Sequence, residues 1–103
     1  MTVDILCSAI RAQRLLRFYY AGDDVPGPRL VEPHMVAFTT ADNLVLSGWF
    51  LGGVSESRDG QGWREYLLDS MSDIVVLPDG FLGPRPGYNP SGGTKLKRVQ
   101  CRL

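Results

Sequence analysis

The spacing of the apolar residues changes once along this chain, and that change constrains the fold more than any other feature. Over residues 3–14 the apolar side chains recur at helical spacing, and Thr2 is a residue type that caps helices. From Leu15 the period becomes two, so that in Leu16–Tyr20 the apolar side chains share one face. The pattern predicts a single N-terminal helix followed by strands, which disfavours a parallel α/β arrangement.

Turn-forming residues divide the rest of the chain into short strands. Gly22–Pro28 and Pro78–Gly80 predict turns, Gly52–Gly62 predicts a hairpin loop, and Pro33 predicts a strand edge or a bulge. The expected fold is mainly β, of the α+β type: an N-terminal helix and a small five- or six-stranded antiparallel barrel of the SH3 or Sm kind. Strands are expected at residues 16–20, 29–32, 35–39, 44–51, 63–68, 74–77 and 94–103.

The 103 residues are enough for one domain and too few for two. Residues 1–80 are expected to form the barrel domain. Residues 81–103 are expected to form a Gly- and Pro-rich arm and a basic C-terminal edge strand, packed on or beside the barrel. The arm should be irregular up to residue 93 and tethered by Phe81 and Tyr88.

Composition narrows the function classes. The hydrophobic fraction of 44% and the charged fraction of 21% are those of a globular protein, and no apolar stretch is long enough to span a bilayer. No secretory signal is recognisable, so we expect a cytoplasmic protein without a membrane partner. Eleven basic and eleven acidic residues cancel, which excludes a uniformly basic nucleic-acid binder. Lys95–Arg102 forms a local basic cluster, either a functional patch or a solvated strand edge.

No catalytic or metal-binding arrangement is recognisable. Cys7 and Cys101 form neither a disulfide framework nor a zinc motif, and we expect each to be a small buried apolar side chain. His34 is the only histidine, and an ordinary surface or strand-end position is expected for it. The glycines match no phosphate-binding loop. We therefore expect a protein that is not an enzyme and needs no cofactor and no metal.

Two arginines on predicted strands are the best candidates for ligand binding. Arg29 and Arg64 could present their guanidinium groups to a phosphate or carboxylate. Alternatively, each pairs with a carboxylate of this chain, such as Glu32, Glu65 or Asp69. Tyr20 could stack on a base beside them, or belong to the core as part of its apolar face.

The order of several short motifs resembles the WYL domain. The matching pieces are Ala9-Ile10, Phe18-x-Tyr20, Arg29-x-Val31-Glu32-Pro33, a strand with Gly48, and Arg64-x-Tyr66-x-Leu68-Asp69-x-Met71. The triplet that names the family is here Leu44-Val45-Leu46, and Ser70 stands where the family usually has a second arginine. The resemblance implies an Sm-like barrel and a bacterial ligand-sensing module. Such modules are usually fused to a DNA-binding helix-turn-helix in transcription regulation, and several are thought to bind nucleic acids or nucleotides.

Two functions follow as alternatives. The first is a stand-alone regulatory module of the WYL type that senses a nucleotide or single-stranded nucleic acid and modulates a partner. Its site would include Arg29 and Arg64, with Tyr20 and His34 as neighbours. The second is a protein–protein interaction or assembly module without a small ligand, forming a homo-oligomer or docking on a partner. The aromatic residues Trp49 and Trp63, which look exposed in the sequence pattern, favour the second.

Overall fold

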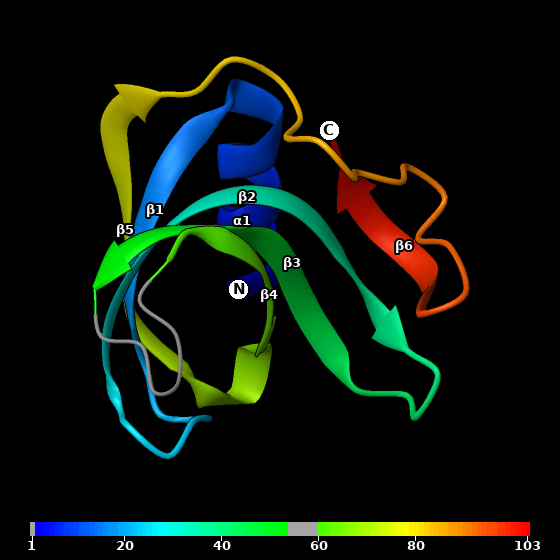
Figure 1. The fold of residues 1–103 in the computed structure, drawn as a ribbon, viewed down its shortest axis with the longest axis horizontal. Coiled ribbons are helices and arrows are strands. Elements are labelled where there is room, and N and C mark those ends of the chain that lie inside the picture. The colour runs from blue at the N-terminus through cyan, green and yellow to red at the C-terminus, as the bar shows by residue number, and fades with distance from the viewer. Residues whose placement is uncertain (1, 54–59) are drawn as a thin grey trace.

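The computed structural model describes residues 2–53 and 60–103. One helix, α1 (Thr2–Ala12), precedes the strands (Figure 1). The strands are β1 (Arg14–Tyr20), β2 (Gly27–Thr39), β3 (Leu44–Gly53), β4 (Gly62–Leu67), β5 (Met71–Gly80) and β6 (Leu96–Arg102), with a 3₁₀ turn at Leu68–Ser70. The prediction of a helix followed by a mainly β, antiparallel fold is confirmed. The expected hairpin loop lies largely outside the described residues.

The strands form one antiparallel sheet in the order β4-β3-β2-β1-β5, with β6 paired to β2. The sheet bends strongly around its interior (Figure 1). Within the described residues β4 and β5, the two ends of this path, do not pair with each other. The sheet therefore curves as a small barrel does but stays open along that line.

The strand β2 is continuous where the sequence predicts two separate strands. One 13-residue strand replaces the expected segments at 29–32 and 35–39. Its pairing with β3 shifts register between Pro33 and Met35, because proline has no N–H to donate. Gly48 lies opposite, where a Cβ atom would come within 2.7 Å of the carbonyl oxygen of Glu32. The bulge lets the first half of β2 pair with β1 and the second half with β6.

Two other boundaries differ from the expectation. The helix ends two residues early because Gln13 has a left-handed backbone (φ 52°), a usual conformation after a helix. The Gln13 side chain donates a hydrogen bond to the carbonyl oxygen of Phe81 at 3.1 Å. The turn expected at Pro78–Gly80 is wrong, since these residues continue β5 and Gly80 pairs with Arg14.

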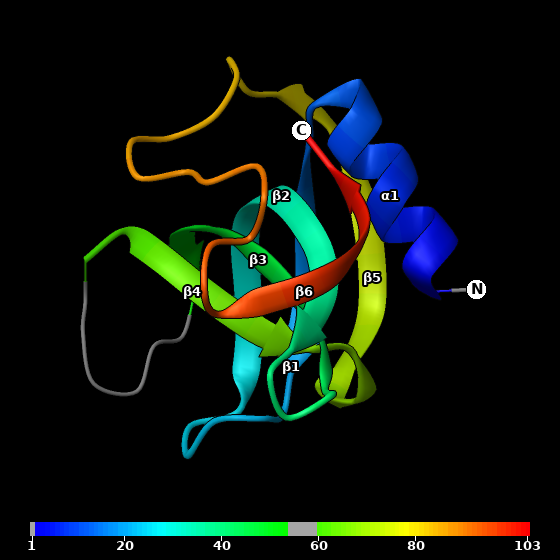
Figure 2. The same cartoon turned by 90° about the vertical axis from the view of Figure 1, so that its right-hand side faces the viewer.

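The sheet buries apolar side chains on both faces. The main core lies between α1 and the concave face, and its fully buried members are Leu6, Ile10, Leu16, Val31, Val36 and Leu46. A smaller cluster contains Met35, Ala37, Val45 and Leu96, with Tyr88 and Val99 packed against it. The segment between β5 and β6, which includes Tyr88, reaches across to this second cluster (Figure 2). The C-terminal residues therefore cover sheet surface that the first 80 residues leave open.

The arm, residues 81–95, has no regular strand or helix, as the sequence predicts. Its expected aromatic tethers are present: Phe81 stacks on the ring of His34 with centroids 5.6 Å apart, and the Tyr88 ring lies 5.5 Å from the same ring. The indole Nε1 of Trp63 donates to the carbonyl oxygen of Pro86 at 2.8 Å. Trp63 and Trp49 are half-buried beside the arm rather than exposed.

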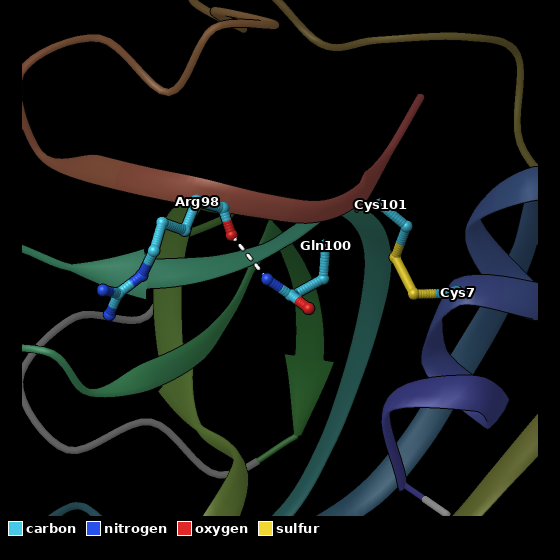
Figure 3. Close-up of a disulfide and its surroundings, with 4 residues drawn as sticks. All are labelled: Cys7, Arg98, Gln100 and Cys101. Carbon is cyan, nitrogen blue, oxygen red and sulfur yellow. Dashed lines mark hydrogen bonds between the residues drawn. A yellow bond between two sulfur atoms is a disulfide. The ribbon is translucent and has the colours of Figure 1, made fainter.

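A disulfide joins Cys7 in α1 to Cys101 in β6, which corrects the expectation of two separate apolar cysteines (Figure 3). The two residues are 94 positions apart, and their Cα atoms lie 5.7 Å from each other. Because the two cysteines are so far apart in the sequence, no local motif indicates that they form a bridge. Beside the bridge, the Gln100 side chain donates to the carbonyl oxygen of Arg98 at 2.7 Å (Figure 3).

Among the described residues, no helix has both the length and the apolar character needed to cross a membrane.

The disulfide should contribute a large part of the stability. Closing a loop of roughly 100 residues is worth about 4–5 kcal/mol in the chain-entropy treatment, which is comparable to the whole stability of a small domain. We expect reduction by dithiothreitol to lower the free energy of unfolding by about that amount, measured by urea titration. The double variant Cys7→Ala, Cys101→Ala should be insensitive to the reductant. Coincident transitions for the oxidised and reduced protein would contradict the prediction.

Candidate anion-binding site

Arg29 is buried in β2, and its guanidinium group is almost fully used by the chain itself. Nη1 donates to the carbonyl oxygens of Gly27 (3.0 Å) and Pro28 (3.2 Å), and Nη2 to the carbonyl oxygen of Val25 (3.0 Å). Nη2 also lies 3.1 Å from a carboxylate oxygen of Asp23. Arg29 therefore holds the turn between β1 and β2, and its acidic partner is none of the three that the sequence suggested.

Arg64 lies half-buried in β4 and keeps donors without partners among the described residues. Nη1 donates to the carbonyl oxygen of Trp63 and Nη2 to that of Gly60, each at 3.2 Å. The guanidinium stacks over the ring of Phe50 at 5.1 Å. It makes no ion pair within residues 2–53 and 60–103. Since a guanidinium has five N–H donors, this arginine can still bind an anion.

The Tyr66 hydroxyl is the unexpected member of this group. Tyr66 is 2% exposed, and its hydroxyl has no hydrogen-bond partner among the described residues. Burial raises the pKa of Tyr66, while the charges of Arg64 and Arg29 oppose that rise. The sequence placed Tyr66 on the same strand face as Arg64 but assigned it no role. A buried hydroxyl without a partner is costly, so an acceptor that reached this atom would relieve that cost.

Tyr20 lies between Arg29 and the Tyr66 ring. Its ring packs edge-on against Tyr66 (4.9 Å) and Arg29 lies 5.8 Å from its centroid. The hydroxyl accepts the backbone N–H of Leu67 at 2.9 Å. Burial raises the pKa of Tyr20, and Gly22 packs so closely that a Cβ atom there would clash with the hydroxyl. Tyr20 thus belongs to the core, the second of the two expected alternatives.

The fourth predicted site residue, His34, lies apart from this group. It is fully buried rather than at the surface, and its ring contacts Trp63, Phe81 and Tyr88. Nδ1 lies 2.8 Å from the carbonyl oxygen of Glu32, and Nε2 accepts the backbone N–H of Arg85 at 3.2 Å. Because Nε2 faces a donor, the ring is neutral with its proton on Nδ1. His34 anchors the arm.

The charged residues Arg85 and Glu32, which both contact His34, also hold the arm on the sheet. Arg85 makes a bidentate pair with the carboxylate of Glu32, at 2.8 and 2.9 Å, and its guanidinium lies 5.0 Å from the ring of Trp49. Burial is the main cause that lowers the pKa of His34. The Arg85 charge adds to this, while the Glu32 carbonyl and carboxylate oppose it.

The basic C-terminal cluster is partly neutralised by an acid. Lys97 and Arg98 both pair with Asp42, at 2.9 and 2.8 Å, and these pairs, with Lys97 first, lower the pKa of Asp42. The described residues contain no group of three or more metal-ligating side chains.

A family model and a solved structure are similar to this chain, and both agree with the fold described above. The family model of the WYL domain matches residues 1–76. A solved structure, proteasome accessory factor B/C (PafBC) of Arthrobacter aurescens, is similar with a TM-score of 0.67 and 22% sequence identity. The match covers 88% of this chain and 14% of that one, so the likeness concerns the fold of a small part of a longer protein. No curated protein matches the chain.

The neutral state of His34 should make stability depend on pH. Its folded pKa lies below the unfolded value of about 6.5, so the unfolded chain takes up a proton first as the pH falls. The contribution of His34 is complete above pH 6.5. It should be lost as the pH falls through the folded pKa, at up to about 1.4 kcal/mol per pH unit.

Urea titrations between pH 8 and pH 5 measure this dependence. The variant His34→Gln keeps an acceptor for the Arg85 N–H but does not titrate, so its stability should change little between pH 7.5 and pH 5.5. Equal slopes for the variant and the wild-type protein would show that His34 is not the titrating group.

Proposed function

This chain belongs to the WYL domain family, and we propose that it is a regulatory, non-enzymatic module that senses a nucleotide or single-stranded nucleic acid and modulates a partner. The observation that carries the proposal is that Arg64 and the Tyr66 hydroxyl share one strand face and, among the described residues, both keep N–H or O–H donors without partners. A phosphate oxygen would accept from both groups, and charged hydrogen bonds of this kind are worth about 1.5–3 kcal/mol.

We assign different roles to the four residues that the sequence singled out. Arg64 is the proposed ligand contact, together with Tyr66. Arg29 and Tyr20 are proposed to position these two, because Arg29 adds positive charge from a fixed place and Tyr20 packs against the Tyr66 ring. His34 is proposed to act only through the arm that it anchors.

The modulated partner is part of the proposal, and the similar solved structure is a longer protein, of which this chain covers 14%. We propose that residues 1–80 form the SH3- or Sm-like sensing unit and that residues 81–103 brace its outer face, as the contacts of Tyr88 and Leu96 with the second apolar cluster support. The cytoplasm and transcription regulation are the proposed setting. In a reducing compartment Cys7 and Cys101 would be thiols, and the module would be less stable.

An assembly function is the second candidate, and the outer edge of β5 favours it. Within the described residues β5 pairs only with β1, and its side chains Val75 and Val76 are 40% and 39% exposed. An unpaired edge with apolar side chains can add a strand from another chain. If this edge forms a homo-oligomer, light scattering at high protein concentration should give a dimer or larger, and Val75→Lys should restore the monomer. A strict wild-type monomer would refute self-association.

The sensing proposal predicts that Arg64→Ala weakens binding without unfolding the domain. Fluorescence anisotropy with a short labelled single strand should show at least a tenfold loss of affinity, while the melting temperature changes by no more than about 2 °C. Tyr66→Phe should weaken binding severalfold and leave the melting temperature equal or higher, since a buried unpartnered hydroxyl is removed.

Arg29→Met is the contrasting variant, because the donors of this arginine are used inside the chain and its loss should act on stability. It should lower the free energy of unfolding by about 2–4 kcal/mol. Binding to the wild-type protein should weaken steeply as salt rises, since phosphate contacts release counterions. Absence of binding to any nucleotide or strand, or equal affinities for the wild-type protein and Arg64→Ala, would refute the proposed function.

A further inference from the structure

A cleft of about 420 Å³ lies where the arm meets the outer face of the sheet, and Arg64 of the proposed anion site borders it. Its main lining residues are Met35, Trp63, Glu65, Tyr88, Lys95 and Leu96. The volume is within the range of small-molecule sites. Tyr88, Lys95 and Leu96 lie beyond residues 1–76, the part that the family model matches, so the cleft depends on the arm of this chain.

The two proposed sites lie on opposite faces of β4. Trp63 and Glu65 alternate with Arg64 and Tyr66 along the strand, and alternate side chains point to opposite faces. Arg64 also borders the cleft, but its guanidinium lies over the ring of Phe50. The charged side chains that face the cleft are therefore Glu65 and Lys95.

The floor of the cleft is apolar and aromatic. Met35 and Leu96 are 2% and 9% exposed and belong to the second apolar cluster. Trp63 and Tyr88 form a nearly parallel pair, with 19° between the ring planes and 6.3 Å between centroids. Such a floor suits an aliphatic or aromatic side chain of a ligand.

Two opposite charges stand at the rim. Glu65 comes from β4 and Lys95 from the end of the arm, and both are exposed. Within residues 2–53 and 60–103, neither makes an ion pair, whereas Lys97 and Arg85 do. A simple anion would be repelled by Glu65, and a simple cation by Lys95. A ligand that has both charges satisfies the two residues together.

We propose that this cleft binds a small zwitterion of the amino-acid type with an apolar side chain, as a free amino acid or a short peptide. The ligand ammonium lies at Glu65, its carboxylate at Lys95, and its side chain on Met35 and Leu96. The volume is ample for a dipeptide. The ligand bridges β4 and the arm, so it favours the docked arm, and this second site goes beyond the proposed sensing of nucleotides.

Titration of the full chain with leucyl-leucine, free leucine, N-acetyl-leucyl-leucine and leucyl-leucinamide tests the proposal. The chain has two tryptophans, and their indole N–H signals in ¹H–¹⁵N spectra separate the cleft residue Trp63 from Trp49. We expect the zwitterionic probe to shift the Trp63 signal, and each capped probe to bind at least tenfold more weakly. Comparing leucine with leucyl-leucine decides between an amino acid and a peptide.

Two rim variants assign the contacts. Glu65→Gln should weaken the binding of leucyl-leucine at least fivefold but leave the affinity for N-acetyl-leucyl-leucine unchanged. Lys95→Met should also weaken the binding of leucyl-leucine at least fivefold but leave the affinity for leucyl-leucinamide unchanged. Asp79→Asn and Lys97→Met, which change charges outside the cleft, are the matched controls and should bind like the wild-type protein. Equal affinities for capped and uncapped probes, displacement by adenosine monophosphate, or no Trp63 shift with any probe would overturn the proposal.

Discussion

The backbone of a buried strand must have partners for its N–H and C=O groups, and β2 meets this requirement with three different strands. It pairs with β3 along most of its length, with β1 before Pro33 and with β6 after it. The bulge at Pro33 makes the exchange possible, because proline donates no hydrogen bond there. Further register shifts lie between Leu30 and Val31 and between Val36 and Phe38, so the pairing of β2 is irregular at three positions along its length.

His34, next to the bulge, couples that backbone irregularity to the arm. Its two ring nitrogens and its carbonyl oxygen bond to Glu32, Arg85 and the C-terminal residue Leu103. Its ring lies among aromatic side chains from β4 and the arm. A neutral imidazole suits this place because one nitrogen donates and the other accepts. The disulfide from Cys7 to Cys101 fixes the neighbouring strand β6 on α1, so the C-terminal part of the chain is held at both sides.

The two faces of β4 separate two kinds of chemistry. The inner face has the buried hydroxyl of Tyr66 and Arg64, which makes no ion pair within the described residues, and it is where we propose that a phosphate binds. The outer face has Trp63 and Glu65 at an arm-lined cleft, where the charges are mixed and the floor is apolar. Arg64 and Tyr66 lie within the part of the chain that the WYL family model matches, whereas the cleft also has lining residues from the arm. The arm thus adds a surface to a family module.

The sequence by itself determined the order of elements, since the period of the apolar residues and the turn residues are local properties that a single chain displays. It also placed Tyr20 and Arg64 on strand faces, because these follow from alternation, and it predicted Phe81 and Tyr88 as the aromatic tethers of an irregular arm. Only the tertiary structure decided which groups each side chain contacts or bonds to. The turn before Arg29 takes up its donors, the Tyr66 hydroxyl has no hydrogen-bond partner among the described residues, and Cys7 bonds to a cysteine 94 residues away. Such contacts depend on how distant strands pair and bend, and no local spacing records that.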